Sequence, residues 1–312
     1  MLEKRGSGGI VTDLSLRIRQ ARQALDSADH IIVGGGSGLS AAAGLTYGGQ
    51  RFQEHFPDFI HKYGLRDMYS ASFYPFETPE ELWAHWARHI HVNRYLPQAL
   101  PLYGLLRELV GSKSSFVITT NVESQFAKAG FQPDRLFEVQ GNYAWFQCAR
   151  ACHDRLYDNH DVVLDMVKET KDCAVPTRLV PLCPRCGGAM DVNLRHNEYF
   201  VQDEAWHRAA AAYEVFLDTT AGSRLVCLEL GVGFNTPGII RYPFERMLRQ
   251  NIQSTLIRLN RNDLQGFPGN ESRTIGFAED MEGHGEEGVE GRRAAYQKRG
   301  NAPGMHDLGF FP

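Results

Sequence analysis

The sequence IIVGGGSGLSAAAGL, residues 31–45, predicts a buried strand, a glycine-rich turn and the first turns of a helix. The opening residues are apolar and β-branched, which favours a strand. The glycines leave the backbone without side chains, so that it can turn sharply and approach a ligand closely. Ser37 or Ser40 is available to cap the helix that follows. The start of such a helix favours a diphosphate, although a glycine-rich loop is equally consistent with an ordinary tight turn.

Later segments repeat this pattern of an apolar strand that ends in polar or glycine-rich residues. These segments are SSFVITTNVES (114–124), RLFEVQGN (135–142), SRLVCLELGVGFNTPGII (223–240) and STLIRLNRND (254–263). Helical periodicity separates them, as in residues 13–29, where Asp13 is available as a cap, and in a helix expected to begin near Pro237. Strands that alternate with helices predict an α/β, Rossmann-like, doubly wound parallel sheet. In such sheets the carboxyl ends of the strands contact the ligand.

Residues 45–95 predict a helical insertion. Their first part is rich in aromatic residues and has no clear period. This fits either a surface insertion with a small core of its own or a lid over a ligand, with a hinge at Gly48 and Gly49. Thr78 is expected to cap a helix, with Pro79 at its first position and Glu81 completing a capping box. Of the histidines at positions 85, 89 and 91, only His85 and His89 share a helical face, and no third metal ligand is evident near them. We therefore expect packing or surface roles for these histidines.

Residues 145–195 contain two cysteine pairs, CARAC and CPRCGG. Their spacing, with a Gly-Gly after the second pair, is typical of a tetrahedral zinc site. The expected ligands are Cys148, Cys152, Cys183 and Cys186. Cys173 or His153 can replace one of them, and four free thiols are the alternative. Because four protein ligands leave no open position, we expect this zinc to be structural.

The composition excludes several classes of function. The chain has 312 residues, 43% hydrophobic and 22% charged, as is usual for a globular protein. The net charge of −4 gives no reason to expect nucleic acid as a partner, and no apolar run reaches the length of a membrane span. The first residues have no signal-peptide core, so we expect a cytoplasmic protein that is not bound to a membrane. Residues 281–312 are polar and glycine-rich, which is typical of a flexible tail.

The order of these motifs resembles that of the sirtuin family. GSGLS (36–40) is similar to the sirtuin Gly-Ala-Gly-Ile-Ser turn, TTNVE (119–123) is similar to Thr-Gln-Asn-Ile-Asp, and VQGN (139–142) stands where sirtuins have His-Gly. The cysteine pairs follow at the sirtuin positions. GVGFNTP (231–237) and RLNRND (258–263) resemble the late glycine turn and the strand-end asparagine that meets adenosine. The resemblance covers residues 25–280 and implies a Rossmann-like sirtuin fold, NAD as co-substrate and a structural Zn²⁺.

Three departures from the sirtuin pattern, GLTYGGQRF (44–52), Thr120 and Gln140, resemble the macrodomain-linked class M sirtuins. That class is associated with ADP-ribosylation of a lipoyl-carrier protein, which is similar to the glycine-cleavage H protein, and with control of oxidative stress. A macrodomain hydrolase partner reverses the modification. The resemblance therefore implies an NAD-dependent protein mono-ADP-ribosyltransferase that releases nicotinamide.

The resemblance also implies the site residues. Asn121 and Gln140 take the catalytic positions, and Glu123 stands where the family's Asp meets the nicotinamide carboxamide. Asn142 and Arg195 are expected in the wall of the same pocket. The other cofactor-binding positions are Gly36, Ser37, Gly38, Leu39, Arg51, Phe52, Thr120, Gly231, Val232, Gly233, Asn235, Thr236, Asn260, Arg261 and Phe277. The expected NAD-binding domain comprises residues 13–144 and 196–280.

Gln140 decides between possible reactions. In a deacylase the histidine at this position accepts a proton, and a glutamine amide has no pKa near neutrality with which to do so. Gln140 therefore argues against efficient deacylation and leaves ADP-ribosyl transfer open, because the target protein then supplies the nucleophile. Deacylation, NAD hydrolysis in a defence system, and a regulatory module that binds NAD or ADP-ribose with little turnover are the alternatives.

Overall fold

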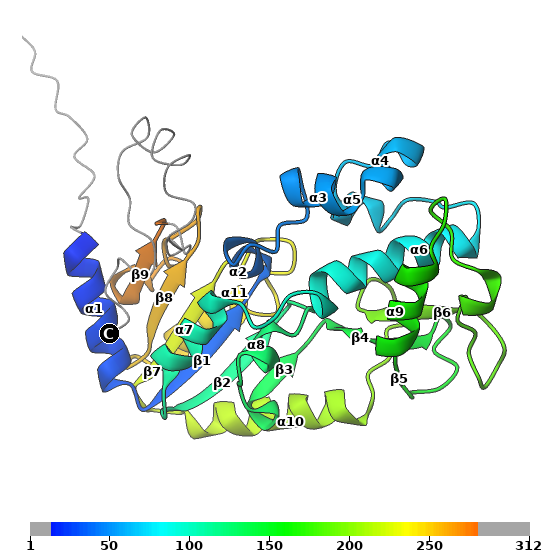
Figure 1. The fold of residues 1–312 in the computed structure, drawn as a ribbon. Helices are drawn as coiled ribbons and strands as arrows, with labels where there is room; N and C mark the ends of the chain where they lie inside the picture. The colour runs from blue at the N-terminus through cyan, green and yellow to red at the C-terminus, as the bar shows by residue number, and fades with distance from the viewer. Residues whose placement is uncertain (1–13, 280–312) are drawn as a thin grey trace, which may run out of the picture.

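A six-stranded parallel sheet forms the body of the molecule in a computed structural model that describes residues 14–279 (Figure 1). The strand order is β3-β2-β1-β7-β8-β9, and every neighbouring pair is parallel. The strands are β1 (His30–Gly35), β2 (Ser114–Thr119), β3 (Leu136–Glu138), β7 (Leu225–Leu230), β8 (Thr255–Leu259) and β9 (Thr274–Phe277). The order reverses at β1, because the chain adds strands on both sides of it. This confirms the predicted Rossmann-like, doubly wound sheet.

Helices cover both faces of this sheet. One face packs against α1 (Leu14–Ser27), α2 (Ser37–Ala42), α7 (Pro101–Val110) and α8 (Gln125–Lys128), and the other against α10 (Glu204–Thr219) and α11 (Arg241–Gln250). The side chains of β1 alternate between the two layers, since Ile31 and Val33 enter the first core whereas Ile32 enters the second. A strand buried on both faces needs the continuous apolar run that the sequence has there.

A second, antiparallel sheet lies beside the first, at the right in Figure 1. Its order is β5-β4-β6, with β4 (Gly141–Cys148), β5 (Tyr157–Asp158) and β6 (Met190–Leu194). The helix α9 (His160–Glu169) packs near it against α6 (Pro79–Ile90). The remaining short helical segments of this part of the chain are α3 (Gly49–His55), α4 (Pro57–Tyr63), α5 (Met68–Ala71), the π-helix η1 (His91–Tyr95) and the 3₁₀ turn η3 (Thr177–Leu179).

The insertion and the cysteine module share one hydrophobic core. Phe52, Phe59 and Trp83 from the insertion lie in the same cluster as Phe146 and Met190 from the second sheet. Trp83 and Phe146 are in direct ring contact, with centroids 4.7 Å apart. The aromatic residues of the insertion therefore form a core, as one of the two sequence hypotheses expected, but this core includes the cysteine module. The predicted domain boundaries at 45–95 and 145–195 stay a prediction, and the predicted tail lies outside the described residues.

Two regions differ in detail from the sequence prediction. The third predicted strand forms β3, which ends at Glu138 before a turn, but the sequence did not predict that β4 begins directly at Gly141, whose φ is 92°. Such a φ suits glycine and turns the chain from the first sheet into the second. The helix after the late glycine turn begins at Arg241 instead of near Pro237, since Thr236 to Ile240 form turns first. The segments Pro133–Arg135 and Glu271–Arg273 are 3₁₀ turns before β3 and β9.

The predicted helix caps are only partly correct. Thr78 caps α6, because its hydroxyl accepts a hydrogen bond from the Glu81 N–H at 3.3 Å. The carboxylate of Glu81 does not complete a capping box, since it pairs with Lys62 at 2.9 Å. Neither Ser37 nor Ser40 caps α2, whose N-cap residue is Gly36. The predicted cap Asp13 lies outside the described residues.

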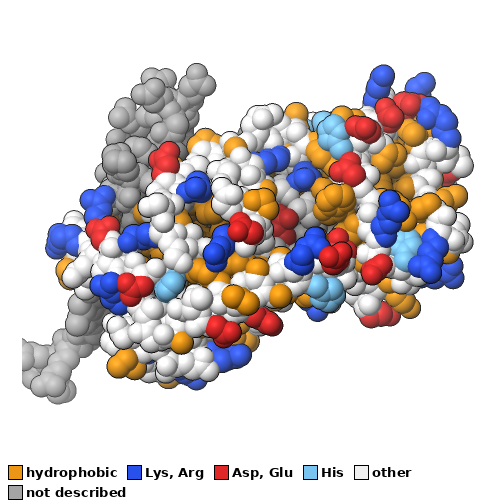
Figure 2. Space-filling view, turned by 90° about the horizontal axis from the view of Figure 1, so that it is seen from below, with side chains coloured by type: hydrophobic (Ala, Val, Ile, Leu, Met, Phe, Trp, Pro, Cys, Tyr) orange, Lys and Arg blue, Asp and Glu red, His pale blue; other side chains and the backbone are white. Residues whose placement is uncertain are grey.

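His85, His89 and His91 do not gather as metal ligands. His85 and His89 are fully buried among aromatic rings, as the packing hypothesis expected, and His91 is half-buried. Burial lowers the pKa of His85 to about 3, so this ring is neutral at physiological pH. In the part of the chain that the structure describes, no helix has the length and apolarity needed to cross a membrane. Figure 2 shows basic and acidic side chains interspersed over the face that it draws.

Four buried charges join β7, β8 and α11. The carboxylate of Glu229 accepts hydrogen bonds from Arg241 at 3.0 Å and from Arg258 at 2.8 Å, and Arg258 also pairs with Glu245 at 2.9 Å. All four side chains are at most 2% exposed. Buried charges are tolerated only when they are paired, so each of these residues depends on the others.

Replacement of Glu229 by Gln is expected to destabilise the fold strongly. The change leaves two buried guanidinium groups with one carboxylate between them, which costs about 3–5 kcal/mol. Urea denaturation at pH 7 measures this loss. The matched control is Glu204→Gln, at a side chain that is 87% exposed and pairs only with Arg208, where we expect a change below about 0.5 kcal/mol. Equal unfolding free energies for the two variants would show that the network does not stabilise the sheet.

Candidate functional site

Two glycine-rich turns touch at the carboxyl ends of β1 and β7. The Gly36 N–H donates to the Leu230 carbonyl and the Gly38 N–H donates to the Gly231 carbonyl, both at 2.9 Å. A Cβ on Gly36 would lie 2.7 Å from the Gly231 oxygen, and Gly231 itself has a φ of +60°. Neither turn therefore has room for a side chain at the contact.

The glycines of the first turn have two different tasks. Gly34 and Gly35 belong to β1, where added Cβ atoms would meet Ile240 at 2.5 Å and Phe126 at 2.6 Å. They are needed for core packing. Gly36 to Gly38 follow the strand, and the start of α2 lies among them. Leu39 is fully buried in the core, so only its backbone is left for a ligand.

A buried polar group lies behind the first turn. Asn121 follows β2, and its Nδ2 donates to the Gly36 carbonyl at 3.0 Å. Glu123 accepts from the Ser40 hydroxyl at 2.7 Å and from the Tyr103 hydroxyl at 3.2 Å. Tyr103 is also within 3.4 Å of the Asn121 amide, and burial raises the pKa of its phenol well above the usual value. The sequence predicted Asn121 and Glu123 here.

Sequence reasoning missed Ser40 and Tyr103 as members of this group. Ser40 stood out only as a possible cap, and Tyr103 only as part of the helix α7, which is 20 residues before Glu123. Thr120 lies beside the group, half-buried, and its N–H donates to the Gly35 carbonyl at 3.0 Å. The structure thus brings the predicted residues of β1 and β2 together at one edge of the sheet.

Gln140 lies in the turn between the two sheets. It is half-buried, and its carbonyl accepts from the Arg195 N–H at 3.0 Å. Two residues earlier, at the end of β3, the carboxylate of Glu138 accepts from Asn142 Nδ2 at 2.5 Å. Burial raises the pKa of Glu138 to about 7, the largest of several effects on this group. Sequence reasoning did not identify Glu138, because a single glutamate in a strand gives no signal of its own.

The loop before the insertion is tied to the second sheet. The Tyr47 hydroxyl bonds the Tyr143 hydroxyl at 2.9 Å, and the latter bonds His89 Nε2 at 2.8 Å. Arg51 donates to the Val92 carbonyl at 2.6 Å and to the Asn93 side chain at 2.9 Å. These contacts fix the loop from two sides.

The predicted cofactor residues of the insertion face its own core. Arg51 donates its hydrogen bonds to residues of the insertion, among them the Thr46 carbonyl at 2.9 Å. Phe52 is 2% exposed and stacks on Phe56, with ring centroids 5.2 Å apart. The structure does not bring these two side chains together with the polar group behind the first turn, and their part in cofactor binding stays a prediction.

The late glycine turn is anchored through one carbonyl. Val232 accepts from Arg241 Nη2 at 3.0 Å and from Asn260 Nδ2 at 2.7 Å. Asn260 in turn donates its N–H to the Phe277 carbonyl at 3.0 Å, and Phe277 is fully buried. The other predicted residues of this edge are exposed, namely Gly233, Asn235, Thr236 and Arg261. The buried ion network therefore reaches the predicted cofactor turn through Arg241.

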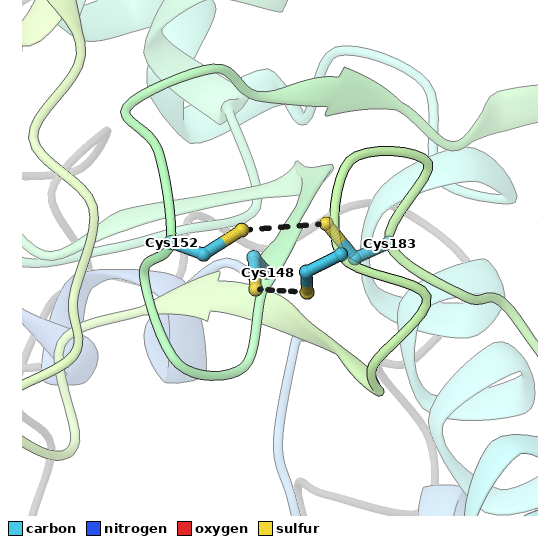
Figure 3. A group of neighbouring side chains, drawn as sticks. Cys148, Cys152 and Cys183 are labelled. Carbon is cyan, nitrogen blue, oxygen red and sulfur yellow. Dashed lines mark hydrogen bonds between the residues drawn. The ribbon is translucent and has the colours of Figure 1, made fainter.

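Four cysteine side chains converge beside the second sheet (Figure 3). The sulfur atoms of Cys148 and Cys186 are 3.7 Å apart, as are those of Cys152 and Cys183, and all four lie within 4.8 Å of one another. Four thiolates around a zinc ion at about 2.3 Å stand about 3.8 Å apart, so this arrangement fits tetrahedral zinc. The pKa of Cys186 is lowered to about 6, mainly by a hydrogen bond from the Gly188 N–H. This shift favours the thiolate form that zinc requires.

The two alternative ligands differ in their positions. His153 Nε2 lies 3.5 Å from the Cys183 sulfur, next to the four cysteines but outside the group of mutually close ligand atoms. Cys173 is 2% exposed, and burial raises its pKa to about 11. It is not part of the cysteine group either. The geometry supports the four cysteines that the spacing predicted.

Curated proteins similar in sequence modify proteins with ADP-ribose or remove acyl groups. A protein ADP-ribosyltransferase of Staphylococcus aureus is 37% identical over 262 residues, which cover 83% of each chain. A probable bifunctional ADP-ribose hydrolase/ADP-ribosyltransferase of Fusarium oxysporum is 32% identical over 77% of this chain and 41% of that protein. An NAD-dependent protein deacylase of Thermus thermophilus is 27% identical over 63% of this chain and 70% of its own. No protein-family model matches the sequence.

Solved structures share the fold. The sirtuin Sir2Tm bound to a propionylated peptide has a TM-score of 0.55 at 17% identity, and the match covers 90% of this chain and 98% of that one. A Sir2 homologue in complex with NAD has a TM-score of 0.50 over 84% of this chain and 86% of that one. At these identities the likeness concerns the fold, which is that of the sirtuins.

Loss of zinc is expected to unfold the cysteine module, because the ion would no longer join the two cysteine pairs. Cys183→Ser should lose the bound metal, because an alcohol oxygen is a poor zinc ligand, and its melting temperature should fall by about 5 °C or more. Elemental analysis and thermal melts with and without chelator measure both effects. The matched control is Cys173→Ser, at a buried thiol outside the cluster, which should keep one zinc per chain. A metal-free wild-type protein whose melting temperature does not respond to chelator would contradict this.

Proposed function

Since the chain belongs to the family of sirtuin-type protein ADP-ribosyltransferases, we propose that it transfers ADP-ribose from NAD to a protein and releases nicotinamide. The relatives above 30% identity support transfer over deacylation, because the deacylases are less similar and match a smaller share of the chain. The observation in the chain itself that supports this choice most directly is Gln140, where a deacylase needs a base.

The cofactor is proposed to lie across the two glycine-rich turns. The diphosphate would approach Gly36, Ser37 and Gly38, where the backbone is free of side chains. The adenosine half would lie toward Asn235 and Asn260. This proposal is supported by the position of all these residues at the carboxyl ends of β1, β7 and β8, where open α/β sheets bind nucleotides.

At the nicotinamide end the proposed task of the protein is orientation. Breaking the bond between ribose C1′ and the nicotinamide nitrogen leaves an oxocarbenium-like ribose, which must be held and protected from water. We propose that Asn121 contacts the ribose and that Glu123 meets the nicotinamide carboxamide. Their existing bonds to Gly36 and Ser40 keep both side chains in one position, so little ordering is left for the reaction to require.

Gln140 is proposed to bond the ribose hydroxyls without exchanging protons. The nucleophile then comes from the target protein and forms the new bond to C1′ as nicotinamide leaves. A lipoyl-carrier protein similar to the glycine-cleavage H protein is the proposed acceptor, and a macrodomain hydrolase the proposed partner that removes the modification. A cytoplasmic role in oxidative stress belongs to the same proposal. The resemblance to class M sirtuins supports these three points.

Intact-mass measurement tests the reaction directly. With NAD and a lipoylated carrier, the carrier should gain the mass of one ADP-ribose unit. Loss of acyl groups from an acylated peptide would favour deacylation instead, and free ADP-ribose without a modified protein would indicate NAD hydrolysis. No consumption of NAD at all would leave a binding module.

Replacement of Asn121 by Ala is expected to abolish transfer. The change removes the amide that bonds the Gly36 carbonyl and, by our proposal, the ribose, so kcat should fall by about a hundredfold or more. Nicotinamide release measures the rate. The matched control is Gln20→Ala, which removes an exposed amide on α1 and should keep the wild-type rate. Normal transfer by the Asn121 variant would mean that the active site is placed wrongly.

A further inference from the structure

A small polar cluster joins the two segments that hold the proposed catalytic residues. Asn142 Nδ2 donates to the Ser124 hydroxyl at 2.6 Å and to the Glu138 carboxylate at 2.5 Å. The amide has this orientation because its Oδ1 accepts the Ala144 N–H at 2.9 Å. Ser124 is also among the side chains that lower the pKa of the Glu138 carboxylate. We call these three side chains the triangle; both of its hydrogen bonds come from the Asn142 amide.

The triangle lies between two parts of the chain whose spacing the backbone also fixes. The Val139 N–H donates to the Thr119 carbonyl at 3.1 Å, and the Tyr143 N–H donates to the Val122 carbonyl at 2.9 Å. Ser124 ends the segment after β2 that contains Asn121, whereas Glu138 and Asn142 stand two residues on either side of Gln140. Gln140 itself lies in the turn that joins Glu138 to Asn142, so the position of this turn depends on the residues at its two ends.

The backbone of Ser124 is in a strained conformation. Its φ is +63°, in the left-handed region that few residues other than glycine adopt, at a cost of about 1–2 kcal/mol. A glycine would adopt this backbone more easily but would have no hydroxyl. The serine is therefore explained by the bonds that its side chain makes.

We propose that Glu138 is a positioning residue for ADP-ribosyl transfer. Through Asn142 and Ser124 it keeps the side chains of Asn121 and Gln140 at a fixed relative position. The inference rests on the proposed function. It adds a residue that neither the sequence motifs nor the resemblance assigned.

The charge of Glu138 is set by its surroundings. Burial raises its pKa to about 7, and Glu123 acts in the same direction. Asn142, Arg94 of the π-helix η1 and Ser124 act in the opposite direction. Above pH 7 the carboxylate is ionised and accepts from Asn142. Below pH 7 one carboxyl oxygen of Glu138 is protonated and becomes a hydrogen-bond donor. The Asn142 amide then has a weaker acceptor, and the relative position of the two segments is less firmly fixed.

Activity and stability should therefore change with pH in opposite directions. The folded-state pKa of about 7 lies above the ordinary value of 4.5, so the folded state binds the proton more tightly than the unfolded chain. The contribution of Glu138 to stability is thus largest at low pH and is lost as pH rises from about 4.5 to 7. The aligned, ionised form becomes populated over the upper part of that range.

The test compares wild type with Glu138→Gln, whose amide oxygen still accepts from Asn142 but does not titrate. The measurement is kcat for nicotinamide release from NAD at pH 6 and pH 8, with melting temperatures at the same pH values. For wild type we expect kcat at pH 8 to exceed that at pH 6 by about tenfold, as for one group that titrates at pH 7. The variant should show a ratio below about twofold, with KM for NAD unchanged. Glu204→Gln, on the exposed side of α10, should keep the wild-type ratio.

A second variant covers the case in which Glu138→Gln fails to fold. Ser124→Gly relieves the strained backbone and removes the hydroxyl, so its melting temperature should not fall, whereas kcat at pH 8 should drop by about threefold or more. A wild-type pH ratio in Glu138→Gln, or full activity in Ser124→Gly, would overturn the inference while leaving the proposed function intact. A loss above about a hundredfold at both pH values with normal melting would make Glu138 a direct proton acceptor and overturn the positioning role. Absence of nicotinamide release from wild type at either pH would overturn the proposed function and the inference together.

Discussion

Two lengths of backbone approach each other so closely in this protein that neither tolerates a side chain. The contact between Gly36 or Gly38 and Gly231 sets the distance between the ends of β1 and β7, the two central strands of the parallel sheet. Because the sheet order reverses at β1, the same contact lies where open sheets of this type bind nucleotides. A steric requirement of the fold and the proposed position of the diphosphate thus coincide at one point.

Buried polar side chains hold this contact from two directions. On the side of β2, Asn121 bonds the Gly36 carbonyl, and Glu123 bonds the Ser40 hydroxyl in α2. On the side of β8, Arg241 and Asn260 both bond the Val232 carbonyl. Burying a polar group without a hydrogen-bond partner costs free energy. These side chains therefore have essentially one favourable geometry. The two halves of a dinucleotide would therefore meet turns that are rigid before binding.

Sequence reasoning succeeded where one element determines its own structure. The apolar run of β1, the glycines after it and the spacing of Cys148 and Cys186 each predicted the local outcome. It failed where the partner lies far along the chain. Ser40 was interpreted as a possible helix cap, because nothing local reveals that Glu123, 83 residues later, accepts a hydrogen bond from its hydroxyl.

The same limit explains what the sequence analysis did not foresee. No local signal indicated that the insertion and the cysteine module share a core, in which Trp83 packs on Phe146. The polar turn after the third predicted strand was expected, but no local signal showed that a strand of a second sheet begins there at the left-handed Gly141. Long-range packing and single backbone angles are not encoded in hydrophobic period or residue spacing, which are the signals that a lone sequence supplies.

The division at Gly141 also bears on the chemistry. It places Gln140 at the junction of the two sheets, with Glu138 at the end of one and Asn142 at the start of the other. A residue that only bonds the ribose depends wholly on where it stands, because it contributes no proton transfer that could compensate for a misplaced contact. In the proposed reaction the position of Gln140 is therefore decisive, and the triangle of Ser124, Glu138 and Asn142 beside it is the proposed means of holding it there.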